Sequence, residues 1–461
     1  MTKLKIIHTN DLHSHFENFP KIERLIAEKR MTAEQNNEEF LLFDIGDFMD
    51  RVHPLTEATN GQANIEWLNK RNYDLVTIGN NEGLGNSHQQ LEELFKDANF
   101  PVIIGNLKTK ATEEIPDFAI SSQIYEFADN KVGVLALTAP FVLTYPLVDW
   151  DIQLVQDVLP EQIAELKAQG CGTIILMSHL GISMDKRIAK KYPEVNLIIG
   201  SHTHHLFEHG EVDGTTQLAA AGKYGMYVGE IDLTLENNQI QDIKVDTIKT
   251  AELPEEPNDE QIINDYLELG HELLQQQKIA EVPFDLNNDV TSEHANIHYA
   301  LKAIEQVAGT DIAVLNNGLF LKELPAGTVT ADDIHDLLPH TMHVMKVSLK
   351  GQDIWRLFLE MEFNRLFLRR HQQKGMGFRG KYFGELVYDN VKVNIEKRSV
   401  LIHDQPIEPE KEYSLATLDH YLFVPYFPTI KIMGQNKLYY PTVIRDVYSQ
   451  YLKTKFGMNN G

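Results

Sequence analysis

The sequence predicts an α/β domain, a connecting helix and then an α+β domain. Three observations predict this order. The first half alternates short apolar segments with helical patterns, as in a sheet covered by helices on both faces. A proline-broken acidic stretch at 251–257 and a long polar helix at 259–277 follow. The remaining residues mix helices and strands without regular alternation. We therefore divide the chain at 1–249, 250–284 and 285–461.

The first domain is predicted from near-continuous runs of Val, Ile and Leu, which are typical of strands buried on both faces. Helical patterns separate several of these strands, at 20–29, 60–69 and 159–169. Residues 212–248 change to glycine-rich turns and period-two runs, which favour antiparallel strands. The predicted buried strands are 4–8, 40–45, 75–78, 102–104, 132–137, 173–178 and 197–200.

The third segment shows both periodicities. Helical patterns cover 298–307 and 351–365. Strand patterns cover 312–315, 344–349, 385–393 and 411–416. The polar helix before it is typical of a spacer that crosses solvent between domains.

Length and charge restrict the class of protein. A chain of 461 residues exceeds one ordinary hydrophobic core. Its net charge of −25 argues against a surface that binds duplex nucleic acid, because such surfaces need clustered cations. We expect no signal peptide, no membrane span and no membrane partner. Cys171 is the only cysteine, which fits a reducing compartment, so we expect a cytoplasmic protein. The sequence gives no prediction of oligomeric state.

Polar side chains follow five of the predicted strands, at the point where each strand ends. The carboxyl ends of parallel strands meet at one edge of a sheet, where ligands of open α/β sheets bind. Each of these motifs is common by itself, but five motifs that all follow the end of a strand indicate one shared site. The candidate residues are Asp11, His13, Asp47, Asn80, His179, His202 and His204.

These side chains offer imidazole, carboxylate and amide donors, which suit Mn²⁺, Zn²⁺ or Fe²⁺. Seven ligands exceed one tetrahedral ion and suit two ions about 3.5–4 Å apart that share a carboxylate. Asp11 and His13 are two residues apart, so we expect them to project to one side of an extended backbone. The same holds for His202 and His204. The nearby histidines fall outside the pattern and are interpreted as supporting or structural: His8, His15, His88, His205 and His209.

At these residues the sequence resembles the calcineurin-like metallophosphoesterases. It is most similar to the bacterial cytoplasmic branch of the 5′-nucleotidase and 2′,3′-cyclic-nucleotide phosphodiesterase family. The resemblance implies a four-layer α/β/β/α sandwich, joined by a helix to a smaller substrate-binding domain. It also implies that Asp47 bridges the two ions. One ion would then be held by Asp11, His13, Asp47 and His204, and the other by Asp47, Asn80, His179 and His202.

The resemblance extends to the C-terminal segment in part. Asn316-Asn317-Gly318 is similar to the Asn-Gly-Gly stretch of the family. Phe378 corresponds to a base-stacking aromatic, and Arg379 beside it is a cation suited to phosphate. The family arginine expected after Asn-Gly-Gly falls on Leu321. The Gly-Gly-Asp-Gly stretch before the second stacking aromatic is absent, and Tyr426 and Phe427 occupy that region.

The residue that acts as the general acid in the family is also replaced in this sequence. The catalytic histidine of the family falls on Asn81, and the aspartate that orients it falls on Leu84. General acid catalysis contributes roughly 10²–10⁴-fold. Asn81 can donate a hydrogen bond but cannot transfer a proton, so His88 is the candidate substitute acid.

The sequence therefore predicts a hydrolase of phosphate esters, attacked by a hydroxide that bridges two divalent ions. The resemblance implies small phosphorylated substrates, nucleotides among them. Two alternatives stay open at this point. One is a catalytically weak, metal-containing binding or regulatory protein, which the Asn81 and Leu84 substitutions favour. The other is a metal-dependent hydrolase of a non-phosphate ester, such as a sulfur ester.

Overall fold

The computed structural model describes residues 1–375 and 377–457. The chain forms two compact units, Met1–Gly270 and His271–Gly461, and each is described by itself below. Residues 458–461 of the predicted C-terminal domain lie outside the described residues. No helix in the described part of the chain is long and apolar enough to cross a membrane.

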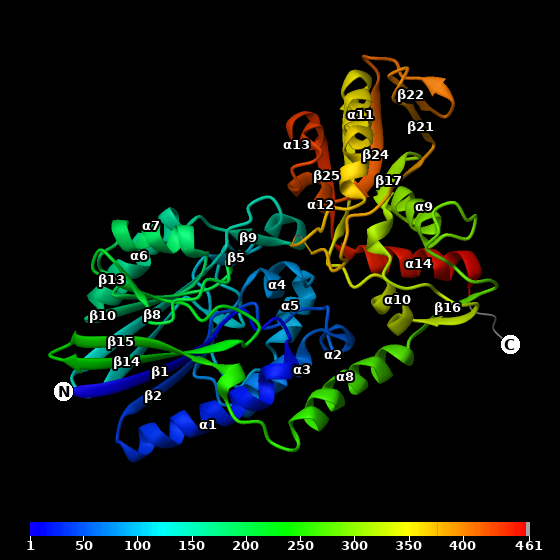
Figure 1. The fold of residues 1–461 in the computed structure, drawn as a ribbon. Helices are drawn as coiled ribbons and strands as arrows, with labels where there is room; N and C mark the ends of the chain where they lie inside the picture. The colour runs from blue at the N-terminus through cyan, green and yellow to red at the C-terminus, as the bar shows by residue number, and fades with distance from the viewer. Residues whose placement is uncertain (376, 458–461) are drawn as a thin grey trace. The chain divides into compact units, whose positions relative to one another are not determined.

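The N-terminal unit is built on two large sheets (Figure 1). In the first sheet, four short strands follow β1 in parallel, and β14 and β15 add antiparallel strands on the other side. Its order is β15 (Gln239–Lys249), β14 (Tyr227–Glu236), β1 (Thr2–Thr9), β2 (Glu39–Asp44), β3 (Leu75–Thr77), β4 (Val102–Ile103) and β6 (Ala119–Ile120).

The second sheet has a parallel centre and antiparallel edges. Its order is β12 (Glu211–Asp213), β13 (Thr216–Ala219), β11 (Leu197–Gly200), β10 (Thr173–His179), β8 (Asn130–Thr138) and β7 (Ser122–Phe127). A small separate pair joins β5 (Leu107–Thr109) to β9 (Trp150–Ile152).

The two sheets pack face to face through every second side chain of their strands. Leu41 and Phe43 of β2 lie in one apolar cluster with Ile175 and Met177 of β10. Alternate residues of β10, such as Leu176, face a different cluster formed with two helices, α6 (Val155–Ala168) and α7 (Ile182–Lys191). On the first sheet, α1 (Phe19–Gln35) packs against β1 and β2. The N-terminal unit is therefore the four-layer α/β/β/α sandwich that was predicted.

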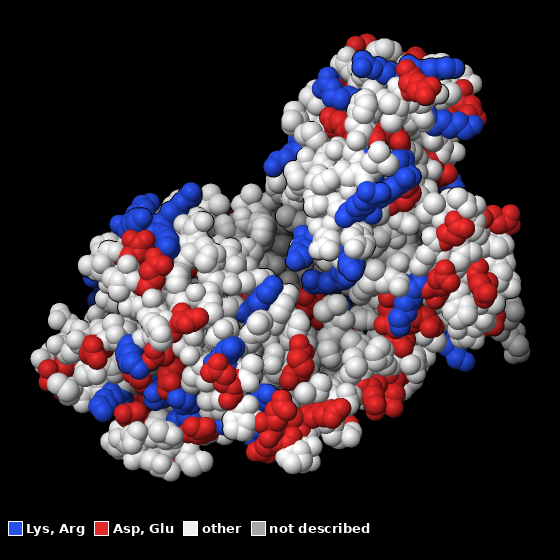
Figure 2. Space-filling model, in the orientation of Figure 1, with Lys and Arg blue, Asp and Glu red and all other residues white. Residues whose placement is uncertain are grey.

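The predicted polar helix is α8 (Asp259–Gln275). Figure 2 shows acidic side chains gathered over this part of the N-terminal unit. Most side chains of α8 are exposed, but one side of the helix packs on that unit. Arg24 holds Asp259 through two hydrogen bonds of 2.6 and 2.8 Å. Gly270 lies so close to α2 (Pro54–Ala58) that a Cβ atom there would come within 2.2 Å of the Leu55 nitrogen.

The C-terminal unit has a mixed five-stranded sheet with helices on both faces. The sheet order is β20 (Leu386–Asp389), β17 (Ala313–Asn316), β24 (Glu412–Leu418), β19 (His343–Lys350) and β25 (Gln435–Val443). One face is covered by α9 (Asn296–Ala308) and α14 (Ile444–Phe456), and the other by α11 (Gly351–Leu368), α12 (His420–Phe423) and α13 (Pro428–Met433).

Small strand groups complete this unit. The predicted single strand at 385–393 is wrong, because Asn390 adopts φ 57° and the chain turns there. The segment instead forms β20 and then β21 (Val391–Asn394), which pairs with β22 (Ser399–Ile402) and β23 (Gln405–Pro406) beyond it. At the start of the unit, β16 (Lys278–Val282) pairs with β18 (Gly327–Thr330), and α10 (Ala331–Leu337) follows.

Two buried histidines make the C-terminal unit sensitive to acid. Burial lowers the pKa of His340 to about 4 and that of His420 to about 3. The unfolded chain takes up these protons near pH 6.5, whereas the folded unit does not. The stability is therefore complete above pH 6.5 and falls as the pH drops toward 4, by roughly 2 kcal/mol per histidine between pH 6.5 and 5.

Amide hydrogen exchange of residues 412–423 at several pH values measures this loss as a drop in protection factor. His420→Phe removes one of the two titrating groups and should make the decline shallower. An identical pH dependence in the native protein and in the variant would show that burial of His420 is not its cause.

Candidate metal centre

Six of the seven predicted ligands gather in two groups of three. The possible ligand atoms within each group all lie within 4.8 Å of one another. The residues come from the loops that follow β1, β2 and β11 and from the end of β10, as the strand-end argument required. The seventh, Asn80, is the first residue of α4 (Asn80–Leu84), directly after β3. The groups are Asp11, His13 and His204, and Asp47, His179 and His202.

Asp47 reaches members of both groups. One carboxylate oxygen, Oδ2, lies 3.4 Å from Nε2 of His179 and 3.8 Å from Nε2 of His13. The neighbouring oxygen, Oδ1, accepts a hydrogen bond of 2.8 Å from the backbone nitrogen of Asn81. A carboxylate between two ligand groups has the position needed to be shared by two cations.

The backbone at these residues is left-handed, so the predicted extended backbone of the Asp11/His13 and His202/His204 pairs is wrong. Asp11 and His13 adopt φ 49° and 48°, and His202 and His204 adopt 70° and 58°. Backbone hydrogen bonds impose this path on the first pair. Asp11 N donates to Gly46 O and His13 N to Asp47 O, at 3.0 and 2.9 Å. Asp and His are among the side chains that tolerate this region best.

Two glycines allow the ligands to approach. Gly46 adopts φ 86°, and a Cβ atom there would lie 2.5 Å from the backbone nitrogen of Gly79. A Cβ atom on Gly79 would lie 2.1 Å from Asp47 Oδ1 and 2.6 Å from His179 Nε2. A side chain at Gly46 would displace the backbone of the facing loop, and one at Gly79 would displace two ligands.

Two buried atoms test whether the residues fit a metal ion. His179 Nδ1 contacts the carbonyl oxygen of Ile45 at 2.8 Å, which leaves Nε2 as the ring nitrogen that faces Asp47. Nε2 of His179 and Oδ1 of Asn80 are buried and have no hydrogen-bond partner among the described residues. Buried polar atoms are rarely left without a partner. Both are common ligand atoms for divalent cations, so the site fits such ions.

The charges of the site follow from its burial. Burial opposes ionisation of Asp47 and His179, but their mutual attraction prevails, lowering the pKa of Asp47 and raising that of His179 to about 10. Burial lowers the pKa of His202 and lowers that of His204 to about 4. These two imidazoles are therefore neutral near pH 7, which is the form that binds a metal.

Asn81, at the position predicted for the acid, contacts a ligand. Its Nδ2 atom lies 2.9 Å from His13 Nδ1 and donates to the carbonyl oxygen of Met49 at 2.9 Å. A metal-binding imidazole donates from its second nitrogen, and an amide NH₂ group is also a donor. Asn81 therefore packs against His13 but does not supply the acceptor that would orient it as a ligand.

His88, the substitute acid of the sequence prediction, lies on α5 (His88–Leu94). Its ring stacks on Trp150 with centroids 3.9 Å apart, and Nε2 lies 3.3 Å from a Glu92 carboxylate oxygen. To act as the acid, this ring would have to leave both contacts.

Glu82 is a supporting residue that the sequence analysis missed. Its buried carboxylate accepts backbone hydrogen bonds from Asp47 at 2.9 Å, Met49 at 3.1 Å and Gly79 at 2.7 Å. Burial and the nearby charge of Asp47 raise the pKa of Glu82 to about 8. The available signal was an acidic residue two positions after the predicted ligand Asn80, in the turn that follows a buried strand.

The predicted substrate residues of the C-terminal unit are mostly buried. Asn316 donates to the Phe383 carbonyl at 2.6 Å and accepts from the Tyr421 hydroxyl at 3.0 Å. Phe378 is only 4% exposed and stacks parallel to His340, with centroids 5.3 Å apart. In this conformation, Phe378 presents little surface to a nucleobase.

The other three predicted substrate residues differ in how far their side chains are exposed. Phe427 is 1% exposed and belongs to the apolar cluster under α11. Arg379 and Tyr426 are half-buried, and the Tyr426 hydroxyl lies 2.5 Å from His371 Nε2. The roles of these residues in binding substrate remain predictions.

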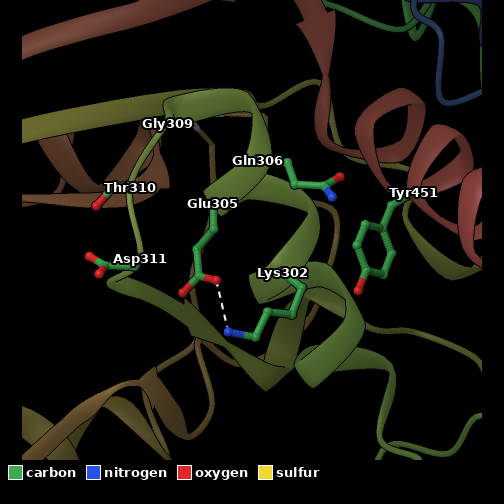
Figure 3. A pocket seen from close by; sticks show the side chains of 7 residues that line it. All are labelled: Lys302, Glu305, Gln306, Gly309, Thr310, Asp311 and Tyr451. Atoms are coloured by element: carbon green, nitrogen blue, oxygen red, sulfur yellow. Dashed lines mark hydrogen bonds and ion pairs between the residues drawn. The ribbon is translucent and has the colours of Figure 1, made fainter. Parts of the chain in front are cut away.

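A hollow of about 580 Å³ lies at the end of α9 (Figure 3). Lys302 Nζ donates to Glu305 Oε2 at 3.0 Å and also pairs with Asp389. The lining residues do not include the five predicted substrate residues, so this hollow is distinct from the predicted substrate site. The lining consists of Lys302, Glu305, Gln306, Gly309, Thr310, Asp311 and Tyr451.

Comparison with known proteins identifies the class. Residues 4–206 match the calcineurin-like phosphoesterase family, and residues 274–423 match the 5′-nucleotidase C-terminal domain. An uncharacterized metallophosphoesterase of Bacillus subtilis, YunD, is 34% identical over 458 residues, covering 96% of this chain and 98% of its own. The chain thus belongs to the calcineurin-like phosphoesterases that carry a 5′-nucleotidase C-terminal domain, and it is a phosphoester hydrolase. This family uses divalent metal ions.

More distant relatives agree with this assignment. A 5′-nucleotidase of Vibrio cholerae is 25% identical over 418 residues, covering 76% of this chain and 74% of its own. A solved structure of a putative 5′-nucleotidase from Staphylococcus aureus, in complex with alpha-ketoglutarate, has a TM-score of 0.67 at 14% identity. It covers 100% of this chain and 98% of its own, and shows that the fold is shared.

The close contact between Gly79 and the ligands can be tested by substitution. Gly79→Ala should displace Asp47 and His179 and weaken divalent metal binding by roughly 10–100-fold, the usual effect of disturbing the support of a ligand. Gly105→Ala is the matched control, because its Cβ atom would meet the Gln162 amide nitrogen at 2.4 Å, among residues that contribute no ligand. Calorimetric titration with Mn²⁺ compares the two. Equal affinities in both variants would contradict the proposed crowding at Gly79.

Proposed function

We propose that the two ligand groups hold two divalent ions bridged by Asp47, and that the protein hydrolyses phosphate esters, nucleotides among them. The position of Asp47 between His179 and His13 is the observation that supports the dinuclear site most strongly. The donor set favours Mn²⁺, Zn²⁺ or Fe²⁺. One ion would be held by Asp11, His13, Asp47 and His204, and the other by Asp47, Asn80, His179 and His202.

When bound, two such ions lower the pKa of a water molecule and neutralise phosphoryl oxygens. The residues of this chain hold the ligands in place for that chemistry. Asp11 is fixed by the Ser201 hydroxyl at 2.5 Å and by the backbone nitrogen of His202. His179 is oriented by the carbonyl oxygen of Ile45. This support keeps the ligand geometry rigid before the substrate arrives.

The proposal also concerns proton transfer to the leaving oxygen. Asn81 has no acidic proton, and its amide is already engaged by His13 and Met49. The reaction should therefore depend on how well the leaving group departs without protonation. Phenolates depart with little help, whereas a ribose alkoxide needs much more.

Nucleotides are included among the proposed substrates because the C-terminal unit matches the 5′-nucleotidase C-terminal domain. The name of the Vibrio cholerae relative supports the same class. A cytoplasmic location is also part of the proposal, and the single buried cysteine, Cys171, is its main support.

A second candidate function is a catalytically weak, metal-containing regulatory protein, which the amide at Asn81 favours. The two functions differ in turnover. Hydrolysis of p-nitrophenyl phosphate with added Mn²⁺, at a rate well above that of a ligand variant, supports the enzyme. Metal binding without turnover supports the regulatory protein.

The bridging role of Asp47 predicts the metal content of a variant. Asp47→Ala should lower the occupancy of both ions and the hydrolysis rate, because the residue is shared by both groups. Elemental analysis of protein purified without chelator measures the occupancy. Asp232→Ala, an exposed carboxylate in the same unit, is the control and should retain both ions. Full metal content in Asp47→Ala would contradict the site.

The absence of an acid at Asn81 predicts a steep dependence of rate on leaving-group pKa. Aryl phosphates should outpace nucleoside monophosphates, and Asn81→His should recover part of the difference. Recovery should be incomplete, because Leu84 cannot orient the new imidazole. Rates for a series of esters measure the slope in the native protein, Asn81→His and His88→Ala. A shallow native slope that steepens only in His88→Ala would make His88 the proton donor.

A further inference from the structure

Three consecutive apolar side chains are exposed on the loop between β8 and the 3₁₀ turn Tyr145–Val148 of the N-terminal unit. Phe141 is 41% exposed, Val142 49% and Leu143 75%. Single exposed apolar residues are common on protein surfaces, but a contiguous group often marks a binding site. We name residues 141–143 the apolar loop.

The apolar loop adjoins the candidate metal centre. The ring of Phe141 meets that of His202 edge to face, with centroids 5.8 Å apart. His202 also contacts His179, with ring centroids 5.2 Å apart. His202 belongs to the ligand group of Asp47. A ligand held at that group therefore lies close to Phe141.

The loop is fixed in place by local hydrogen bonds. Phe141 N donates to Ala139 O at 2.9 Å, and Tyr145 N donates to Phe141 O at 3.1 Å. The Thr144 hydroxyl donates to the same carbonyl at 3.3 Å. The exposure of the apolar side chains is thus a property of an ordered turn.

Tyr145 ties this turn to the helix that carries two residues of the site. Its side chain is fully buried, and its hydroxyl lies against Gly83 of α4, where a Cβ atom would come within 2.5 Å of that oxygen. The same short helix begins with Asn80 and Asn81. The apolar loop and the ligands therefore share one rigid support.

The chemistry of a ligand that would cover this surface can be stated. One end must be an anion that suits the metal centre, and the other must be apolar to gain from burial of the loop. A phosphate ester with an aromatic or apolar leaving group meets both requirements. Esters of small polar alcohols meet only the first.

We propose that the apolar loop is a specificity wall of the active site, which binds the aromatic or apolar part of the leaving group through Phe141 and Leu143. This inference rests on the proposed metal-dependent hydrolysis and narrows its substrates to phosphate esters that carry such a group. A nucleobase is one aromatic group of this kind, but the wall itself selects for apolar surface and not for a ribose.

The test compares two substrates with similar leaving-group chemistry. Benzyl phosphate and methyl phosphate both release an alkoxide, but only the benzyl ester carries an apolar ring. Phe141→Ala and Leu143→Ser should each lower kcat/KM for benzyl phosphate by about tenfold, mainly through KM, the range that apolar contacts contribute to specificity. Methyl phosphate should change less than twofold. Val212→Ala, an exposed apolar residue on β12, is the matched control and should alter neither substrate.

Binding of nonhydrolysable analogues separates this inference from the proposed function. Calorimetry of the metal-loaded protein should show that benzylphosphonate binds more tightly than methylphosphonate, and that Phe141→Ala removes most of the difference. This result would support binding of the apolar group by the apolar loop even if the protein showed no turnover. Equal losses for both ligands would show that the loop only maintains the structure of the site or is covered by another part of the protein. No loss for either ligand would show that it does not contact substrate. Either of these results overturns the proposal.

Discussion

The close approach of two loops at Gly46 and Gly79 is the constraint on which the metal centre depends. Neither residue has a Cβ atom, and a side chain at either position would enter space occupied by the other loop or by a ligand. The approach places the Asp47 carboxylate against His179. Glu82 fixes the same arrangement by accepting hydrogen bonds from the backbone of both loops. The strands before these loops supply the rigidity, because each is buried between layers.

The same constraint explains why residues distant in sequence act together. The loops after β1, β2 and β3 emerge at one edge of the first sheet, and the ligands at the ends of β10 and β11 emerge at one edge of the second. Cross-loop hydrogen bonds, such as Asp11 N to Gly46 O, then determine the left-handed turns that aim the ligands. Substitution of a supporting residue in one loop should therefore affect ligands contributed by another.

The sequence predicted the sandwich and the position of the ligands well, because buried parallel strands leave long runs of Val and Ile and end in short polar turns. The backbone geometry of the ligands was not predictable, since it results from hydrogen bonds between loops more than 30 positions apart. The break at Asn390 was missed for a similar reason, as its flanking residues fit a single strand. For the predicted substrate residues of the C-terminal unit, the sequence did not predict which side chains are buried. The sequence around an aromatic residue such as Phe378, which is buried here, does not show whether the ring lies in a core or at a surface.

The central claim is that one carboxylate, Asp47, joins two divalent ions in a single site. Electron paramagnetic resonance of the protein loaded with Mn²⁺ tests it most directly, because two manganese ions about 3.5–4 Å apart are magnetically coupled. The account predicts a coupled, multiline spectrum at two ions per chain. A spectrum of isolated Mn²⁺ at every loading, with no coupled component, would contradict it.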